Sequence, residues 1–299
     1  MSEDQIPDVV YHFTSMGVLL EILRTKELWA TNVRYLNDIS EHQLFLDAAD
    51  RRVPECIPEL GFLNLQRAAR DSGSVMDHLP SFAQLPFVTS FSREDDSLTH
   101  WRSYCAGGNG VSIGFRTESL LAASVRKPKI ARPGMIVPQP RFSEIYYFGP
   151  NDNEIVDEVI KASYREATDF NSQRDLSMES MAAELTWRLT SAASLFKDYS
   201  FINERECRLI VDNIGWRMDL LCFRTAKSTL IPYVSLSIPS APSASRKIGE
   251  PEGAWNAIES ITIGPTPNMS LSREAVEACC FAHGVSPTIK QSRVTYREL

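Results

Sequence analysis

The stretch Asn203-Glu204-Arg205-Glu206-Cys207-Arg208-Leu209-Ile210-Val211 places two carboxylates at the start of an apolar run. Such a run is typical of a buried β-strand, in which successive side chains point to opposite faces. We therefore expect Glu204, Glu206 and Arg208 to share one strand face. Two interpretations stay open: acids paired with the neighbouring arginines at a solvated strand end, or a catalytic Glu with a second acid in a different role.

The segments around this strand alternate between helix and strand patterns. Upstream, apolar spacing predicts helices at about 154–164 and 178–196, preceded by a strand at 144–148. Downstream, strands are predicted at 216–223, 230–238 and 261–263, then a helix at about 272–283 and a final strand from 285. This irregular alternation favours one α+β domain over residues 1–299, with a flexible insertion at 239–253.

The N-terminal segment predicts a strand, a capped turn and a helix. The run at 9–13 is β-branched and aromatic, and Thr14 or Ser15 can cap a helix that begins directly after it. The N-H groups of that helix would point toward His12 and Thr14, which favours an anionic ligand such as a phosphate. The alternative is that His12 is purely structural.

Hydroxyl side chains mark a further strand at 87–92. Ser90 and Ser92 fall on the same face and need hydrogen-bond partners, which a bound ribose or phosphate, or water, can supply. Trp101 and Tyr104 follow three residues apart and share one face if this segment is helical.

Composition places the chain among ordinary globular proteins. It has 299 residues, 43% of them hydrophobic, and a net charge of -7, so no overall basic field attracts nucleic acid. The six cysteines lack a CxxC spacing, which argues against a metal knuckle or a disulfide framework. The acidic N-terminus does not resemble a secretory signal, and no apolar run approaches the ~18 residues of a membrane span. We expect a cytoplasmic protein with reduced thiols and no membrane contact.

Six short motifs follow one another along almost the whole chain: Tyr11-His12-Phe13-Thr14-Ser15, Leu36-Asn37-Asp38, Ser90-Phe91-Ser92, Trp101-Arg102-Ser103-Tyr104, Gly110-Val111-Ser112-Ile113-Gly114-Phe115 and Glu204-Arg205-Glu206-Cys207-Arg208-Leu209. In this order they resemble a bacterial domain-of-unknown-function family, number 2971. That resemblance implies no activity by itself.

The opening Tyr11-His12 strand, with the Thr-Ser turn, helix and strand that follow it, is similar to the start of ADP-ribosyltransferases, including toxins that modify DNA. In those enzymes an early His binds the NAD ribose, a Ser/Thr-rich strand borders the nicotinamide pocket, and a late Glu, often within Glu-x-Glu, contacts the nicotinamide ribose. His12, the strand at 90–92 and the Glu204/Glu206 pair stand in the same order. The resemblance implies a split, mostly antiparallel sheet with helices packed around it.

The same resemblance implies a role for each residue, with NAD as the substrate. Glu206 would contact the nicotinamide ribose, and Glu204 would orient or deprotonate the acceptor. Arg208 would bind an NAD phosphate or hold Glu206 ionised. The aromatic residue against nicotinamide would be Trp101, Tyr104 or Tyr35. The further NAD-binding residues implied are Tyr11, His12, Thr14, Ser15, Ser90 and Ser92.

We expect an NAD-dependent ADP-ribosyltransferase or NAD glycohydrolase that acts as a bacterial toxin or phage-defence effector on a protein, a nucleic acid or water. The alternative is a catalytically inactive regulatory protein that binds a nucleotide or a partner. A nuclease or other hydrolase built on acid clusters such as Asp95-Asp96 and Glu204/Glu206 is disfavoured, because no set of His and Asp residues has metal-ligand spacing.

Overall fold

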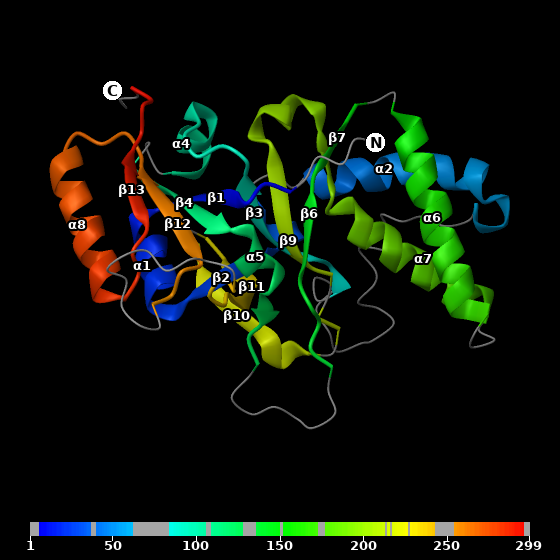
Figure 1. Ribbon diagram of the computed structural model, residues 1–299. Coiled ribbons are helices and arrows are strands. Elements are labelled where there is room, and N and C mark those ends of the chain that lie inside the picture. Colours follow the sequence, from blue (N-terminus) through cyan, green and yellow to red (C-terminus); the bar gives the residue numbers. More distant parts are fainter. Residues whose placement is uncertain are drawn as a thin grey trace.

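The β-branched and aromatic segments of the sequence form a large mixed sheet with helices packed against it (Figure 1). The computed structural model describes residues 6–36, 40–61, 84–105, 109–127, 136–149, 152–172, 177–212, 214–215, 217–226, 228–242 and 254–295. The chain has the α+β class that the pattern of helices and strands predicts, and its large sheet is mostly antiparallel.

Within the described residues, eleven strands join in one sheet. Their bounds are β1 (Val9–Thr14), β2 (Glu27–Asn32), β3 (Phe87–Ser92), β4 (Val111–Arg116), β5 (Ser124–Val125), β6 (Arg141–Glu144), β9 (Glu206–Val211), β10 (Leu221–Thr225), β11 (Leu230–Ser237), β12 (Ile258–Ile263) and β13 (Thr288–Gln291). The neighbours β12 and β13 run parallel, whereas the other pairs of this sheet are antiparallel. A separate parallel pair joins β7 (Tyr146–Phe148) and β8 (Phe196–Asp198).

The sheet branches at β3. On one edge β9 pairs with β3 from end to end, with Ser92 opposite Glu206. On the other edge β2 pairs with Phe87 and Val88, and β1 pairs with Ser92. Because β1 and β2 take opposite ends of the same edge, they diverge and leave residues 89–91 without a strand partner on that side in the described part of the chain.

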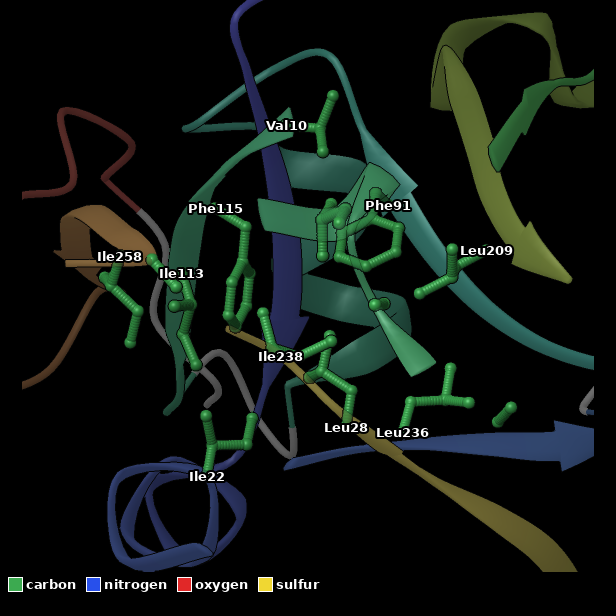
Figure 2. Packing of buried hydrophobic residues seen from close by; sticks show 14 of the residues in the cluster. Val10, Ile22, Leu28, Phe91, Ile113, Phe115, Leu209, Leu236, Ile238 and Ile258 are labelled. Atoms are coloured by element: carbon green, nitrogen blue, oxygen red, sulfur yellow. The ribbon is translucent and has the colours of Figure 1, made fainter. Parts of the chain in front are cut away.

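The main hydrophobic core lies against the branched sheet (Figure 2). Phe91 of β3 and Phe115 of β4 meet edge to face at its centre, with ring centroids 6.1 Å apart. Leu209 of β9 and Leu236 of β11 are fully buried in the same cluster, and Ile22 belongs to the helix α1 (Met16–Thr25) that covers it. This packing holds the strands on both sides of the branch in fixed positions.

A second hydrophobic cluster is mainly helical and lies beside the sheet, on the right in Figure 1. Phe45 of α2 stacks on Phe196 of β8, with ring centroids 4.3 Å apart. An ion pair between Arg52 and Asp157 joins α2 to α6. The other helices of the described residues are α2 (Ser40–Cys56), α4 (Leu98–Tyr104), α5 (Thr117–Leu121), α6 (Asn153–Ser172), α7 (Met178–Ala193) and α8 (Met269–Ala282), with 3-10 turns η1 (Val33–Tyr35), η2 (Pro58–Leu60), η5 (Tyr199–Glu204) and η6 (Met218–Leu220). No helix among the described residues is both long and apolar enough to cross a membrane.

Several predicted elements have different bounds in the structure. The single strand expected at 144–148 is two strands in different sheets, because the chain passes from β6 beside β9 to β7 beside β8. The helix expected to reach 196 ends at Ala193, and Phe196 begins β8. The strand expected at 216–223 begins only at Leu221, after η6. Asn37, Asp38 and most of the expected insertion at 239–253 lie outside the described residues.

Candidate functional site

A cleft of about 530 Å³ lies at the branch of the sheet, where β1 and β2 diverge. It is lined by side chains from distant parts of the chain, and its size falls within the ~300–1,000 Å³ typical of small-molecule sites. Those that matter for the chemistry are His12, Ser90, Tyr104, Lys197, Glu204, Glu206, Arg208 and Arg224.

Glu204 and Glu206 reach the cleft through a turn. Asp198 caps the 3-10 turn η5, which ends at Glu204. Arg205 then takes a left-handed conformation with a φ of 43°, and β9 begins at Glu206. The prediction that both acids belong to one strand is therefore wrong for Glu204, because the backbone at Arg205 is not extended. The two carboxylates meet through their side chains instead.

Lys197 of β8 bridges the two carboxylates. Its Nζ lies 2.7 Å from Glu204 Oε2 and 2.9 Å from Glu206 Oε2. The side chains of Lys197, Glu204 and Glu206 are only 3%, 7% and 5% exposed. Because a buried charge without a counterion is strongly destabilising, the shared ammonium group explains how two carboxylates can be buried in contact with the same atom.

Glu206 accepts as many hydrogen bonds as a carboxylate can. Arg208 donates to it from Nε at 2.6 Å and from Nη2 at 3.0 Å, Lys197 donates at 2.9 Å, and the hydroxyl of Ser90 also donates. These four donors fill the roughly four acceptor positions of a carboxylate. Burial alone would raise the pKa of Glu206, but the charges of Arg208 and Lys197 more than offset it and lower the pKa to about 2.

Arg208 is held by groups of the protein itself. Besides its contacts to Glu206, it donates from Nη1 to the Ser194 carbonyl at 2.8 Å, and its side chain is 3% exposed. Of the two roles considered for Arg208, these contacts favour holding Glu206 ionised over binding a phosphate.

Glu204 has fewer donors than Glu206. The hydroxyl of Tyr104 lies 3.1 Å from both of its carboxylate oxygens, and Lys197 is the second donor. Its backbone carbonyl accepts a hydrogen bond from the Ser92 hydroxyl at 2.9 Å. Judged by its contacts with the described residues, Glu204 rather than Glu206 therefore retains acceptor positions for a ligand. Desolvation of the Tyr104 hydroxyl, beside both acids, raises its pKa.

His12 occupies the open edge of β3. Its Nδ1 lies 3.0 Å from the Ser90 carbonyl, and since a carbonyl only accepts, Nδ1 carries the proton. Burial lowers the pKa of His12, so the ring is neutral near pH ~7 and Nε2 is an acceptor. His100 borders a smaller adjoining cavity of about 70 Å³, and burial lowers its pKa to about 4.

The structure separates the predicted site residues into groups. His12, Ser90, Tyr104, Glu204, Glu206 and Arg208 line the cleft, and so does Tyr35. Tyr11 and Ser92 line the smaller cavity beside it. Thr14 lines a third pocket that borders His12, whereas Ser15 caps α1 by accepting a hydrogen bond from Val18 N. Trp101 is fully buried, packs on Phe13 and donates to Asp96, so it does not reach the cleft.

Several residues of the cleft were not predicted. Lys197 lies between aromatic and acidic neighbours in the sequence, and a single Lys in such a run carries no signal for a buried position. Arg224 likewise looks like an exposed residue of an edge strand. The pair of acids Glu204 and Glu206 was the available signal for a buried cation, because two buried carboxylates require one. The sequence does not indicate which cationic residue it is.

The acids Asp95 and Asp96 lie elsewhere. Asp95 pairs with Lys290, and Asp96 accepts hydrogen bonds from Trp101 and Ser292. Within the described ranges, no group of three or more His, Cys, Asp or Glu side chains is arranged to hold a metal ion.

A family model described as "Protein of unknown function (DUF2971)" matches residues 100–209. The matched segment supports the resemblance to that family for the part of the chain from α4 to β9. It includes Tyr104, Lys197, Glu204, Glu206 and Arg208, whereas His12, Ser90 and Arg224 lie outside it. No curated protein and no solved structure matches the chain.

Proposed function

We propose that this cleft binds NAD and cleaves the bond between nicotinamide and ribose, transferring ADP-ribose to a macromolecule or to water. The observation that carries the proposal is the convergence of His12, Ser90 and Glu206 on one cleft, although the three residues lie on β1, β3 and β9. His12 contacts the Ser90 carbonyl and the Ser90 hydroxyl donates to Glu206, so the three residues form one connected set across neighbouring strands.

The resemblance to ADP-ribosyltransferases adds to this argument. An early His, a hydroxyl-bearing strand and a late Glu-x-Glu are the elements on which that resemblance rests, and here they border a split between β1 and β2. The setting we propose for the activity is that of a bacterial toxin or phage-defence effector.

The proposed reaction uses the two carboxylates differently. The bond between ribose C1′ and the nicotinamide nitrogen breaks, and its electron pair leaves with nicotinamide. Positive charge then develops on the ribose, and ionised Glu206 stabilises this charge more strongly than it does the ground state. The acceptor forms the new bond to C1′, and its proton passes to Glu204, which keeps acceptor positions toward the cleft.

A ribose hydroxyl can reach Glu206 only by replacing one of its present donors. The Ser90 hydroxyl is the replaceable one, because it is neutral and can rotate, whereas Lys197 and Arg208 balance the buried charge. We infer that Ser90 occupies the position that a ribose hydroxyl takes when the ligand binds.

The test is nicotinamide release from NAD by the purified full chain, with and without cell lysate as a source of acceptors. We expect release by the wild type and its loss in Glu206→Gln. Removal of the base in Glu204→Gln should slow the transfer by about 100-fold or more. Glu277→Gln, at an exposed ion pair on α8, is the matched control and should change neither rate nor folding. Absence of release from the wild type in every condition would contradict the proposal.

One observation favours a second function, that of a catalytically inactive protein that binds a nucleotide or a partner and acts as a regulator. Glu206 is already saturated by Arg208, Lys197 and Ser90, which suits a structural ion cluster as well as a catalytic one. Binding of NAD in calorimetry, together with no nicotinamide release, would select this alternative.

A further inference from the structure

Arg224 lies where two cavities meet. It is part of β10, opposite Ile231 of β11, and it lines both the 530 Å³ cleft and an adjoining pocket of about 200 Å³. His12, Trp29 and Thr31 also line both, so the two cavities share a wall beside β2. A ligand that begins at Glu206 and extends past His12 therefore arrives at Arg224.

The cations around this double cavity differ in their partners. Lys197 is bound by Glu204 and Glu206, and Arg208 is bound by Glu206. Arg224 forms no ion pair or hydrogen bond with any residue in the described ranges, although it is only partly exposed and burial lowers its pKa. A guanidinium that loses water without gaining an anion is destabilising, so its position points to an anion that the described part of the chain does not provide.

The other charges that face the adjoining pocket are already paired. Glu21 is bound by Arg24, and Glu27 is bound by Arg126 and by the Ser235 hydroxyl. They therefore do not serve as the counterion of Arg224. Trp29, which packs on Tyr233 with ring centroids 4.8 Å apart, gives the shared wall an apolar surface beside the cation.

We propose that Arg224 binds a phosphate group of the ligand that occupies this double cavity. A planar guanidinium holds a phosphate by two parallel hydrogen bonds, and Arg224 forms no ion pair with the carboxylates of the same cleft, which suit a hydroxyl-rich group. The cavity thus accepts a molecule with a ribose at one end and a phosphate at the other. The choice of NAD as that molecule rests on the proposed function, whereas the phosphate site rests on the geometry of Arg224.

Calorimetry with ADP-ribose and with pyrophosphate tests the site without any turnover. We expect both to bind the wild type, and Arg224→Gln to weaken each by about tenfold or more, since a charge-assisted contact is lost. Arg224→Lys should recover part of the affinity, whereas adenosine, which has no phosphate, should bind wild type and Arg224→Gln equally. Arg273→Gln, at an exposed ion pair on α8, is the control.

Thermal unfolding separates this role from a structural one. Because Arg224 has no partner in the described part of the chain, Arg224→Gln should leave the Tm unchanged or raise it. A fall in Tm would overturn the inference, and so would an ADP-ribose affinity within about twofold of the wild type. If nicotinamide is released from NAD but Arg224→Gln keeps full affinity, the phosphate site is wrong and the proposed function stands. If ADP-ribose binds through Arg224 but no nicotinamide is released from NAD, the phosphate site stands and the proposed function is wrong.

Discussion

Lys197 Nζ lies 2.9 Å from Glu206 Oε2, although β8 and β9 belong to different sheets. The contact links the helical cluster around Phe196 to the branched sheet. Both groups are almost fully buried, and the charge of Lys197 is balanced by Glu204 and Glu206, whereas Glu206 has a second cation, Arg208, on its own strand. The site therefore forms only when the two layers pack together, and its stability and its geometry depend on the same ion cluster.

Lys197→Met tests this dependence. The substitution leaves two buried carboxylates with Arg208 as their remaining cation, so we expect a loss of about 3–5 kcal/mol in the free energy of unfolding, measured with urea. Lys290→Met, which breaks a more exposed pair with Asp95, should lose less than about 1 kcal/mol. Similar losses in the two variants would show that the ion cluster around Lys197 contributes no more to stability than an exposed ion pair does.

Acid should destabilise the protein through Glu206. Its pKa is lowered from 4.5 to about 2 in the folded chain, so the ionised form contributes stability above pH 4.5 that is lost as the pH falls toward 2. The contribution is on the order of 3 kcal/mol. Urea unfolding of wild type and Glu206→Gln between about pH 5.5 and pH 2.5 measures it. The variant should show a shallower loss in this window, and parallel curves would contradict the assignment.

His100 should change the stability of the protein in a less acidic pH range than Glu206 does. It is buried, it stacks on Phe13, and its pKa is lowered from 6.5 to about 4. The neutral ring is the folded form, so stability is complete above pH 6.5 and declines as the pH falls toward 4. His100→Phe keeps the stacking area and removes this titration, so its unfolding free energy should fall less steeply than that of the wild type across that window, where His42, with a pKa lowered to about 4 by burial, still titrates. An unchanged slope would mean that other groups, such as His42, account for the dependence.

Periodicity predicts most of the fold but not its breaks. The alternation at 87–92 and the apolar spacing of α1 are local properties, and both elements form as expected. Arg205 could not be predicted to take a φ of 43°, because Arg has no preference for that region and the turn is fixed by the contacts of Glu204 and Glu206. The break at Ile145 is equally non-local, since it depends on which sheet each half joins.

In the site, too, some residues could be predicted from the sequence and others could not. A His, a hydroxyl strand and a pair of acids could be selected from the sequence because their side chains suit one chemistry. Lys197 and Arg224 could not be selected, since their significance lies in what surrounds them: two carboxylates for one, and none within the described residues for the other. Trp101 and Tyr104 illustrate the converse, because one helix places the first in the core and the second in the cleft.

Ser90→Ala tests whether the Ser90 hydroxyl contacts the bound ligand or only occupies the position that a ligand hydroxyl takes on binding. If the Ser90 hydroxyl only fills an acceptor position of Glu206 until a ribose hydroxyl replaces it, its removal should leave the affinity for ADP-ribose unchanged or higher. Stability should fall by no more than about 1 kcal/mol, because Arg208 and Lys197 still neutralise Glu206. Ser92→Ala is the matched control on the same strand: it removes a buried donor to the Glu204 carbonyl and should cost about 1–3 kcal/mol. A tenfold weaker binding of ADP-ribose by Ser90→Ala, measured by calorimetry, would show instead that this hydroxyl contacts the ligand directly.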